Sequence, residues 1–174
     1  MENKGQVWVE TVIYTLIGLT IIGILLTIVT PKINETRDKA VVEQSVEVLN
    51  FIDAKINDIK YVAGNSRNLQ LSIKSGLIII DSQNDTIEFI LKGSNYKYSE
   101  PGIIIEEGKV KVLSVESGKK YDIYLDLNYS RKFNITYDGI DDIRTIPKAG
   151  VSYDLILSNE GITGELTEIR FHLQ

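Results

Sequence analysis

One uncharged stretch near the N-terminus constrains this chain more than any other feature. No charged residue occurs between Glu10 and Lys32, and residues 12–29 are almost entirely Ile, Leu, Val, Thr and Gly. A helix of this length spans a hydrocarbon layer of roughly 30 Å. The stretch therefore predicts a membrane-spanning helix, and it argues against a soluble enzyme folded around one mixed core.

The rest of the composition excludes several classes of function. The net charge is −5 and the basic residues do not cluster, so the chain lacks the phosphate-neutralising surface of a nucleic-acid-binding protein. It has no cysteine and one histidine, His172, which excludes disulfides and multi-histidine metal sites and leaves little room for triad chemistry. Acidic clusters at residues 81–85 and 138–142 do not match an EF-hand loop, so we interpret them as solvated turns. We expect no catalytic residue, no metal and no cofactor, and a His172 side chain that points to solvent.

The apolar stretch does not resemble a common secretory signal, because it is longer than the usual apolar core of about 7–15 residues and no Ala-x-Ala-like site follows it. Beyond Pro31 the pattern becomes amphipathic, and Pro31 is expected to kink the helix without ending it. The apolar residues that recur at helical spacing are Ile33, Ala40, Val41, Val48, Ile52, Ile56 and Ile59. We therefore predict one long helix over residues 6–64, apolar in its first half and amphipathic in its second half.

From residue 69 onward, apolar and polar residues alternate with a period of two. Leu69, Leu71 and Ile73, for example, alternate with polar neighbours, and Asp138-Gly139 is a strong turn dipeptide. Eight or nine short strands separated by turns are typical of an antiparallel β-sandwich-like or open-barrel domain. The predicted fold class is α+β: a long kinked N-terminal helix followed by a β-domain over residues 69–174.

A charged pentapeptide that ends in Gly5, a long apolar helix, an amphipathic extension and a terminal β-domain together resemble the archaeal type IV pilin-like proteins that carry a class III signal peptide. Lys4-Gly5-Gln6 looks like the processing site of that family. Residues 1–5 would then be the leader peptide, removed after Gly5 by a prepilin peptidase, with Gln6 as the first mature residue. Glu10 falls at the fifth mature position, where type IV pilins characteristically carry a glutamate. The resemblance covers about the first 60 residues, and the β-domain carries no family motif.

The resemblance implies an assembly role for Glu10, which would face the free N-terminal amine of a neighbouring subunit and set subunit register. A carboxylate on a spanning helix is costly and usually marks a function or an interface. The alternative is that Glu10 lies in the first helical turn at headgroup level, where the helix dipole favours it. The implied partners are copies of the chain or related pilins, the prepilin peptidase, the pilus assembly machinery and the membrane, with no nucleic acid.

Four N-glycosylation sequons lie beyond the apolar stretch and begin at Asn34, Asn84, Asn128 and Asn134. They favour an external β-domain, and each asparagine is a candidate glycosylation site. We therefore expect a single-pass membrane precursor with its C-terminal domain outside, followed by an extracellular filament at the cell surface.

The leading hypothesis is a structural, pilin-like subunit of a type IV pilus-like extracellular filament, anchored in the membrane as a precursor and assembled after leader cleavage. The alternative is a permanently anchored bitopic surface β-domain protein for binding or adhesion. The register of Gly5, Gln6 and Glu10 favours the subunit, because a simple anchor does not need it.

Overall fold

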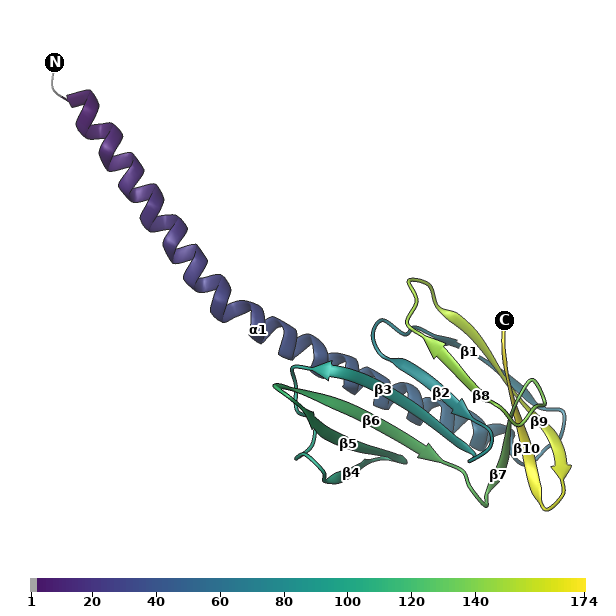
Figure 1. The fold of residues 1–174 in the computed structure, drawn as a ribbon. Helices are drawn as coiled ribbons and strands as arrows, with labels where there is room; N and C mark the ends of the chain where they lie inside the picture. Colours follow the sequence, from purple (N-terminus) through teal and green to yellow (C-terminus); the bar gives the residue numbers. More distant parts are fainter. Residues whose placement is uncertain (1–2) are drawn as a thin grey trace.

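The computed structural model describes residues 3–174, with side chains described from Val7 onward. One long helix, α1 (Asn3–Ile59), precedes ten strands, so the fold is α+β with a long N-terminal helix, as predicted. The strands are β1 (Ser66–Leu71), β2 (Leu77–Asp81), β3 (Thr86–Ser94), β4 (Ile104–Glu107), β5 (Val110–Ser117), β6 (Lys120–Asn128), β7 (Phe133–Tyr137), β8 (Ile143–Pro147), β9 (Tyr153–Thr163) and β10 (Leu166–Leu173). Figure 1 shows the C-terminal half of α1 lying against the strands, while its N-terminal half extends away from them.

The helix continues through Pro31 without interruption. A proline removes one backbone donor, and Figure 1 shows the helix axis changing direction between its projecting half and its packed half. The helix ends at Ile59, before the predicted boundary at residue 64. There the side-chain amide of Asn159 donates a hydrogen bond to the Ile59 carbonyl at 2.8 Å, and Gly64 turns the chain toward β1 with a left-handed φ of +83°.

One face of the C-terminal half of α1 lies in the hydrophobic core. Its residues recur at steps of three or four and are at most 7% exposed: Val42, Val46, Leu49, Ile52, Ile56 and Ile59. The amphipathic prediction is therefore confirmed for this segment. It is wrong at Ile33, which is 60% exposed and lies before Asp38, where the first hydrogen bond between α1 and the β-domain is made.

The strands form two sheets. The six-stranded sheet has the order β4-β5-β6-β3-β2-β8, and all its neighbours are antiparallel. The four-stranded sheet has the order β1-β9-β10-β7, and β7 pairs with β10 in parallel. The sequence predicted antiparallel pairing, and this pair is the exception. Because β7 lies in the chain between two strands of the other sheet, no hairpin sets its direction.

Residues from both sheets and from α1 form one core. Phe89 and Leu125 of the six-stranded sheet and Leu157 and Phe171 of the four-stranded sheet are at most 2% exposed, and they belong to the same cluster as the buried face of α1. The helix contacts β3, β5 and β6 of one sheet and β1 and β9 of the other. Its C-terminal half is thus an integral layer of the β-domain, which anchors the projecting half.

Candidate assembly surface

The projecting half of α1 carries a continuous exposed apolar surface. The side chains in it that are between 38% and 73% exposed are Val7, Trp8, Val9, Val12, Ile13, Tyr14, Leu16, Ile17, Leu19, Ile21, Ile22, Ile24, Leu25, Leu26, Ile28 and Val29. The segment is long and apolar enough to cross a membrane, and no residue of its most apolar window is buried within the chain. Soluble monomers rarely expose so large an apolar surface, so it requires a lipid or protein cover.

Small residues interrupt this apolar surface on two opposite sides of the helix. Thr11, Thr15 and Gly18 share one side at steps of four and three, and Thr20 and Gly23 lie on the opposite side. A Cβ at Gly18 or Gly23 would meet no atom of the chain within 4 Å. Small residues at such spacing allow apolar helices to approach closely, so two neighbours could pack on this segment at once.

The threonine hydroxyls of the projecting half are already satisfied. Thr11 donates to the Val7 carbonyl and Thr15 donates to the Thr11 carbonyl, both at 2.8 Å, and Thr20, Thr27 and Thr30 make equivalent bonds to the preceding turn. A hydroxyl that is paired within its own helix carries a much smaller desolvation penalty than an unpaired one. These threonines are therefore compatible with either a lipid or a protein environment.

Glu10 lies within this apolar surface. It is exposed, and Trp8 and Tyr14 beside it are 69% and 73% exposed. Among the residues whose side chains the structure describes, Glu10 forms no ion pair. The other two residues of the predicted register, Gly5 and Gln6, have side chains outside the described part of the structure.

Besides the contact of Asn159 with the Ile59 carbonyl, three polar contacts join side chains of the packed half of α1 to the β-domain, and the sequence analysis did not anticipate them. The Asp38 carboxylate accepts hydrogen bonds from the backbone and side-chain amides of Asn95, at 2.7 and 2.8 Å. Asn50 binds the β4–β5 turn, donating to the Glu107 carbonyl and accepting from the Lys109 N–H. These contacts join residues 57 to 59 positions apart, a separation at which sequence spacing carries no signal.

The third contact joins the Tyr129 hydroxyl to the Asp53 carboxylate at 3.0 Å. Burial raises the pKa of Tyr129, and the charge of Asp53 and the hydrogen bond to it raise it further. Tyr129 therefore stays protonated and remains a hydrogen-bond donor. Together the three contacts fix the direction in which the apolar half of α1 leaves the β-domain.

The four predicted glycosylation sites differ in accessibility. Asn34, Asn84 and Asn128 are exposed, whereas Asn134 is half-buried on β7. The hydroxyl residues that complete two of the sequons, Thr86 and Thr136, are 7% and 4% exposed. The sequons at Asn34 and Asn128 are thus the two in which both the asparagine and the hydroxyl residue are accessible.

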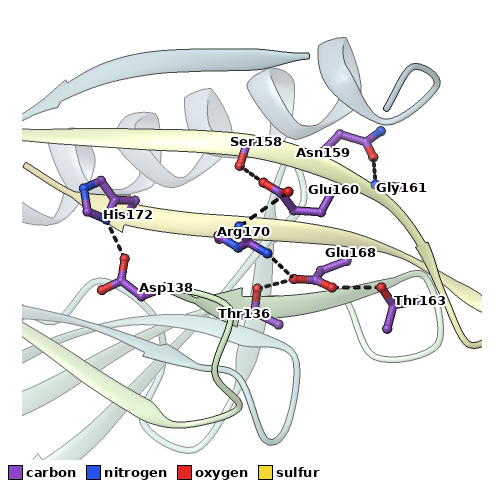
Figure 2. Close-up of polar contacts among 10 residues, drawn as sticks. All are labelled: Thr136, Asp138, Ser158, Asn159, Glu160, Gly161, Thr163, Glu168, Arg170 and His172. Atoms are coloured by element: carbon purple, nitrogen blue, oxygen red, sulfur yellow. Dashed lines mark hydrogen bonds and ion pairs between the residues drawn. The ribbon is translucent and has the colours of Figure 1, made fainter. Parts of the chain in front are cut away.

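A polar network lies on β9, β10 and β7 of the four-stranded sheet (Figure 2). The Glu168 carboxylate accepts hydrogen bonds from the hydroxyls of Thr136 and Thr163, at 3.0 and 2.8 Å, and from the Arg170 guanidinium at 3.3 Å. Arg170 also pairs with Glu160 at 3.4 Å. Burial alone would raise the pKa of Glu168, but the hydrogen bonds and the Arg170 charge outweigh it and lower the pKa. Every strong acceptor here is paired, which is typical of a structural network.

His172 lies on β10, and its side chain is 52% exposed, as predicted. Its Nδ1 contacts the carboxylate of Asp138 in the turn after β7 (Figure 2). Across residues 3–174 the structure brings together no cluster of three His, Asp or Glu side chains suited to a metal ion.

Comparison of the chain with protein-family models, with curated proteins and with solved structures found no match.

Proposed function

We propose that this chain is a structural, pilin-like subunit of a type IV pilus-like extracellular filament of the archaeal kind. The observation that supports the proposal best is the uncovered apolar half of α1, which extends away from a folded β-domain (Figure 1). A surface of this kind must be covered, first by lipid in the precursor and then by the equivalent segments of other copies. No catalytic role and no cofactor form part of the proposal.

The transfer from lipid to a filament core is physically reasonable for this helix. Packing against other apolar helices replaces one apolar environment with another, so no large apolar surface meets water. The small residues on two opposite sides of the segment suit contact with more than one neighbour, which a filament requires and a simple dimer does not.

In this proposal the prepilin peptidase removes residues 1–5, and the new amine of Gln6 pairs with Glu10 of an adjacent subunit. The pair would form in a low-dielectric helix bundle, where an unpaired carboxylate is strongly disfavoured. The β-domains would form the outer shell of the filament, with Asn34 and Asn128 as the accessible glycosylation sites. The assembly machinery of the membrane and further copies of the chain are the proposed partners.

N-terminal sequencing of the protein after co-expression with a class III prepilin peptidase tests the proposal. We expect a product that begins at Gln6, and Gly5→Val should block its formation. A permanently anchored surface protein would keep its original N-terminus in both cases. An unshortened wild-type chain would therefore remove the main support for the subunit and favour the anchor.

A further inference from the structure

A cleft of about 810 Å³ opens where the packed half of α1 meets one end of the six-stranded sheet. Asp53, Asn57 and Lys60 line it from the helix side, because steps of four and three residues place them on one helical face. Lys60 continues the last turn of α1, since its N–H donates to the Ile56 carbonyl at 3.0 Å. The β4–β5 turn and the loop between β6 and β7 line the cleft from the sheet side. Its volume is within the range of about 300–1,000 Å³ that small-molecule sites have, and the proposed function makes no use of it.

One wall of the cleft is fixed by hydrogen bonds within the chain. The Asp53 carboxylate accepts from the Tyr129 hydroxyl and from the Asn57 side-chain amide, both at 3.0 Å. Beside them the partly exposed ring of Phe133 lies against Tyr129, with 5.6 Å between the ring centroids. This wall is therefore preorganised, and it presents an aromatic surface to a ligand.

Lysines from three separate elements converge on this part of the cleft. Lys60 follows α1, Lys109 lies in the β4–β5 turn, and Lys132 lies in the loop before β7. None of the three forms an ion pair with a side chain from Val7 onward, and Lys60 donates one hydrogen bond to the Asn57 amide oxygen at 2.8 Å. Asp53 is the carboxylate that lines this part of the cleft, so three ammonium groups oppose one carboxylate. A negatively charged group of a ligand is therefore favoured here.

Further charged residues flank this part of the cleft without lining it. Asp58 pairs with Lys55 at 3.5 Å. Arg131 offsets the charge of Asp85, whose carboxylate already accepts a hydrogen bond from a backbone N–H of β7 at 2.8 Å. Glu107, next to the β4–β5 turn, adds one negative charge. An excess of positive charge thus remains around the three lysines.

The other part of the cleft extends onto the outer face of the six-stranded sheet and has the opposite charge. Glu106, Lys111 and Asp126 lie in register across β4, β5 and β6, and all three line the cleft. Burial raises the pKa of Asp126, although Lys111 beside it acts in the opposite direction. Glu88 of β3 lies next in the same row, so carboxylates outnumber ammonium groups here. Carboxylates accept hydrogen bonds from hydroxyl groups and repel anions, so this part suits the hydroxyl groups of a ligand.

We infer that the cleft binds a short saccharide that carries a carboxylate, of the uronic acid class. The carboxylate of the sugar lies among the three lysines, its hydroxyl groups donate to Glu106 and Asp126, and the apolar face of a sugar ring packs on Phe133. A neutral sugar would leave the charge of the lysines unused, and a polyanion would meet the carboxylates of the outer part. The inference goes beyond the proposed filament role and does not depend on it, because the cleft lies at the end of α1 that is packed in the β-domain.

Calorimetric titration of the full-length chain in detergent micelles tests the inference. The chain is produced in a host without N-glycosylation, because Asn128 lines the cleft and a glycan attached there would fill it. The probes are the trisaccharides of galacturonic acid and mannuronic acid, their carboxyl-reduced counterparts, and sodium sulfate as a simple anion. We expect at least one acidic trisaccharide to bind with a Kd of about 1 mM or tighter, and its reduced counterpart to bind at least about tenfold more weakly. Three results would each overturn the inference: no binding of either acid, equal binding of an acid and its reduced counterpart, or sulfate binding as tight as that of the acid.

Substitution of the lysines tests where the carboxylate of the sugar lies. Lys109→Gln and Lys132→Gln should each weaken binding of the acidic trisaccharide by about tenfold and leave binding of the reduced counterpart unchanged. The matched control Lys119→Gln removes an exposed lysine from the β5–β6 turn, at the opposite end of β6 from the cleft, and should change neither. All three lysines are exposed, so circular dichroism should show an unchanged fold. Equal losses from Lys119→Gln and Lys109→Gln would mean that overall charge governs binding, and would overturn the inference.

Asp126→Ala tests the hydroxyl contacts. It removes an acceptor, so it should weaken binding of the acidic trisaccharide by several-fold even though it also removes a negative charge. If charge attraction alone held the ligand, the same variant would bind the acidic trisaccharide more tightly. Tighter binding would therefore overturn the assignment of the ligand as a saccharide.

Discussion

The Asp38 carboxylate accepts two hydrogen bonds from Asn95, one from its backbone N–H and one from its side-chain amide. This pair joins α1 to the segment that follows β3, at the point where the helix leaves the sheets. Beside it, the Lys39 ammonium lies 5.8 Å from the centre of the Tyr96 ring. The contacts at this junction hold α1 against the β-domain at the point where its apolar half begins to project.

Asp38→Ala should therefore weaken the junction. Loss of two hydrogen bonds to a partly exposed carboxylate should lower the free energy of unfolding by about 1–2 kcal/mol, measured by denaturant titration of the full-length chain in detergent. The matched control Asp38→Asn keeps one acceptor oxygen and should lose less. Indistinguishable stabilities for all three proteins would show that the pair does not hold the helix.

Alanine substitutions at Leu49 and Phe51 test whether packing of α1 in the core stabilises the β-domain. Leu49 is fully buried, and Leu49→Ala should cost about 2–5 kcal/mol of stability. Phe51 lies two residues away on another face and is 51% exposed, so Phe51→Ala should cost less than about 1 kcal/mol. Thermal unfolding followed by the β-sheet circular dichroism signal distinguishes the two variants. Similar small losses for both would mean that the β-domain folds independently of α1.

The helix and most strands were predictable because each depends on local periodicity. In α1, buried apolar residues recur at steps of three or four from Val42 to Ile59. In β3 and β6, buried and exposed residues alternate. Both patterns can be recognised within a short segment of sequence. Both edge strands of the six-stranded sheet, β4 and β8, were missed. The strand β4 has only four residues, and Arg144, Thr145 and Pro147 give β8 no apolar alternation. An edge position tolerates such residues, but only the completed sheet reveals which segment occupies it.

The candidate assembly surface was likewise predictable as an apolar run. The direction in which this half of α1 leaves the β-domain was not predictable. Asp38 with Asn95 and Asp53 with Tyr129 are pairs of ordinary surface residues until folding brings them together. The parallel pairing of β7 with β10 has the same origin, because it depends on a crossover between sheets. Contacts between distant segments leave no periodic signal in the sequence.

The stability of the chain should fall in acid because of Glu168. Its pKa is lower in the folded protein than its ordinary value of 4.5, so above 4.5 both states are ionised and the stabilisation is fully present. As the pH falls below 4.5 toward the folded pKa, the unfolded state takes up the proton first and this stabilisation is lost. Glu168→Gln should be less stable at pH 7, by about 1–3 kcal/mol, and should approach the wild type in acid.

Glu88→Gln is a control, because the charge of Glu88 is expected to destabilise the folded protein at neutral pH, whereas the charge of Glu168 stabilises it. The pKa of Glu88 is raised above 4.5 in the folded protein, so the folded state protonates first as the pH falls, and the destabilisation present at neutral pH is relieved. In the monomeric chain Glu88→Gln should match or slightly exceed wild-type stability at pH 7. Denaturant titrations at pH 7 and pH 4 compare both variants. If the stability of Glu168→Gln depended on pH as the wild type does, the loss of stability in acid could not be assigned to Glu168.

Glu10→Ala should abolish assembly without affecting insertion. Removal of a charge makes the spanning segment more apolar, so membrane levels and cleavage after Gly5 should remain normal. If Glu10 pairs with a neighbouring amine in a helix bundle, its loss costs about 3–5 kcal/mol, enough to prevent filament formation. A contribution from the helix dipole alone is about 0.3–1 kcal/mol and would leave filaments abundant. Filament counts by electron microscopy distinguish these outcomes.

Immunogold electron microscopy of cells that produce the processed chain tests the proposed function most directly. With an antibody against the β-domain, we expect label along extended filaments outside the cell, and none in cells that carry Gly5→Val. This result would show that the chain is a component of an extracellular filament and that its presence there depends on processing after Gly5. Correctly processed chains that remain in the membrane fraction, with no labelled filament, would contradict the assignment of this chain as a filament subunit.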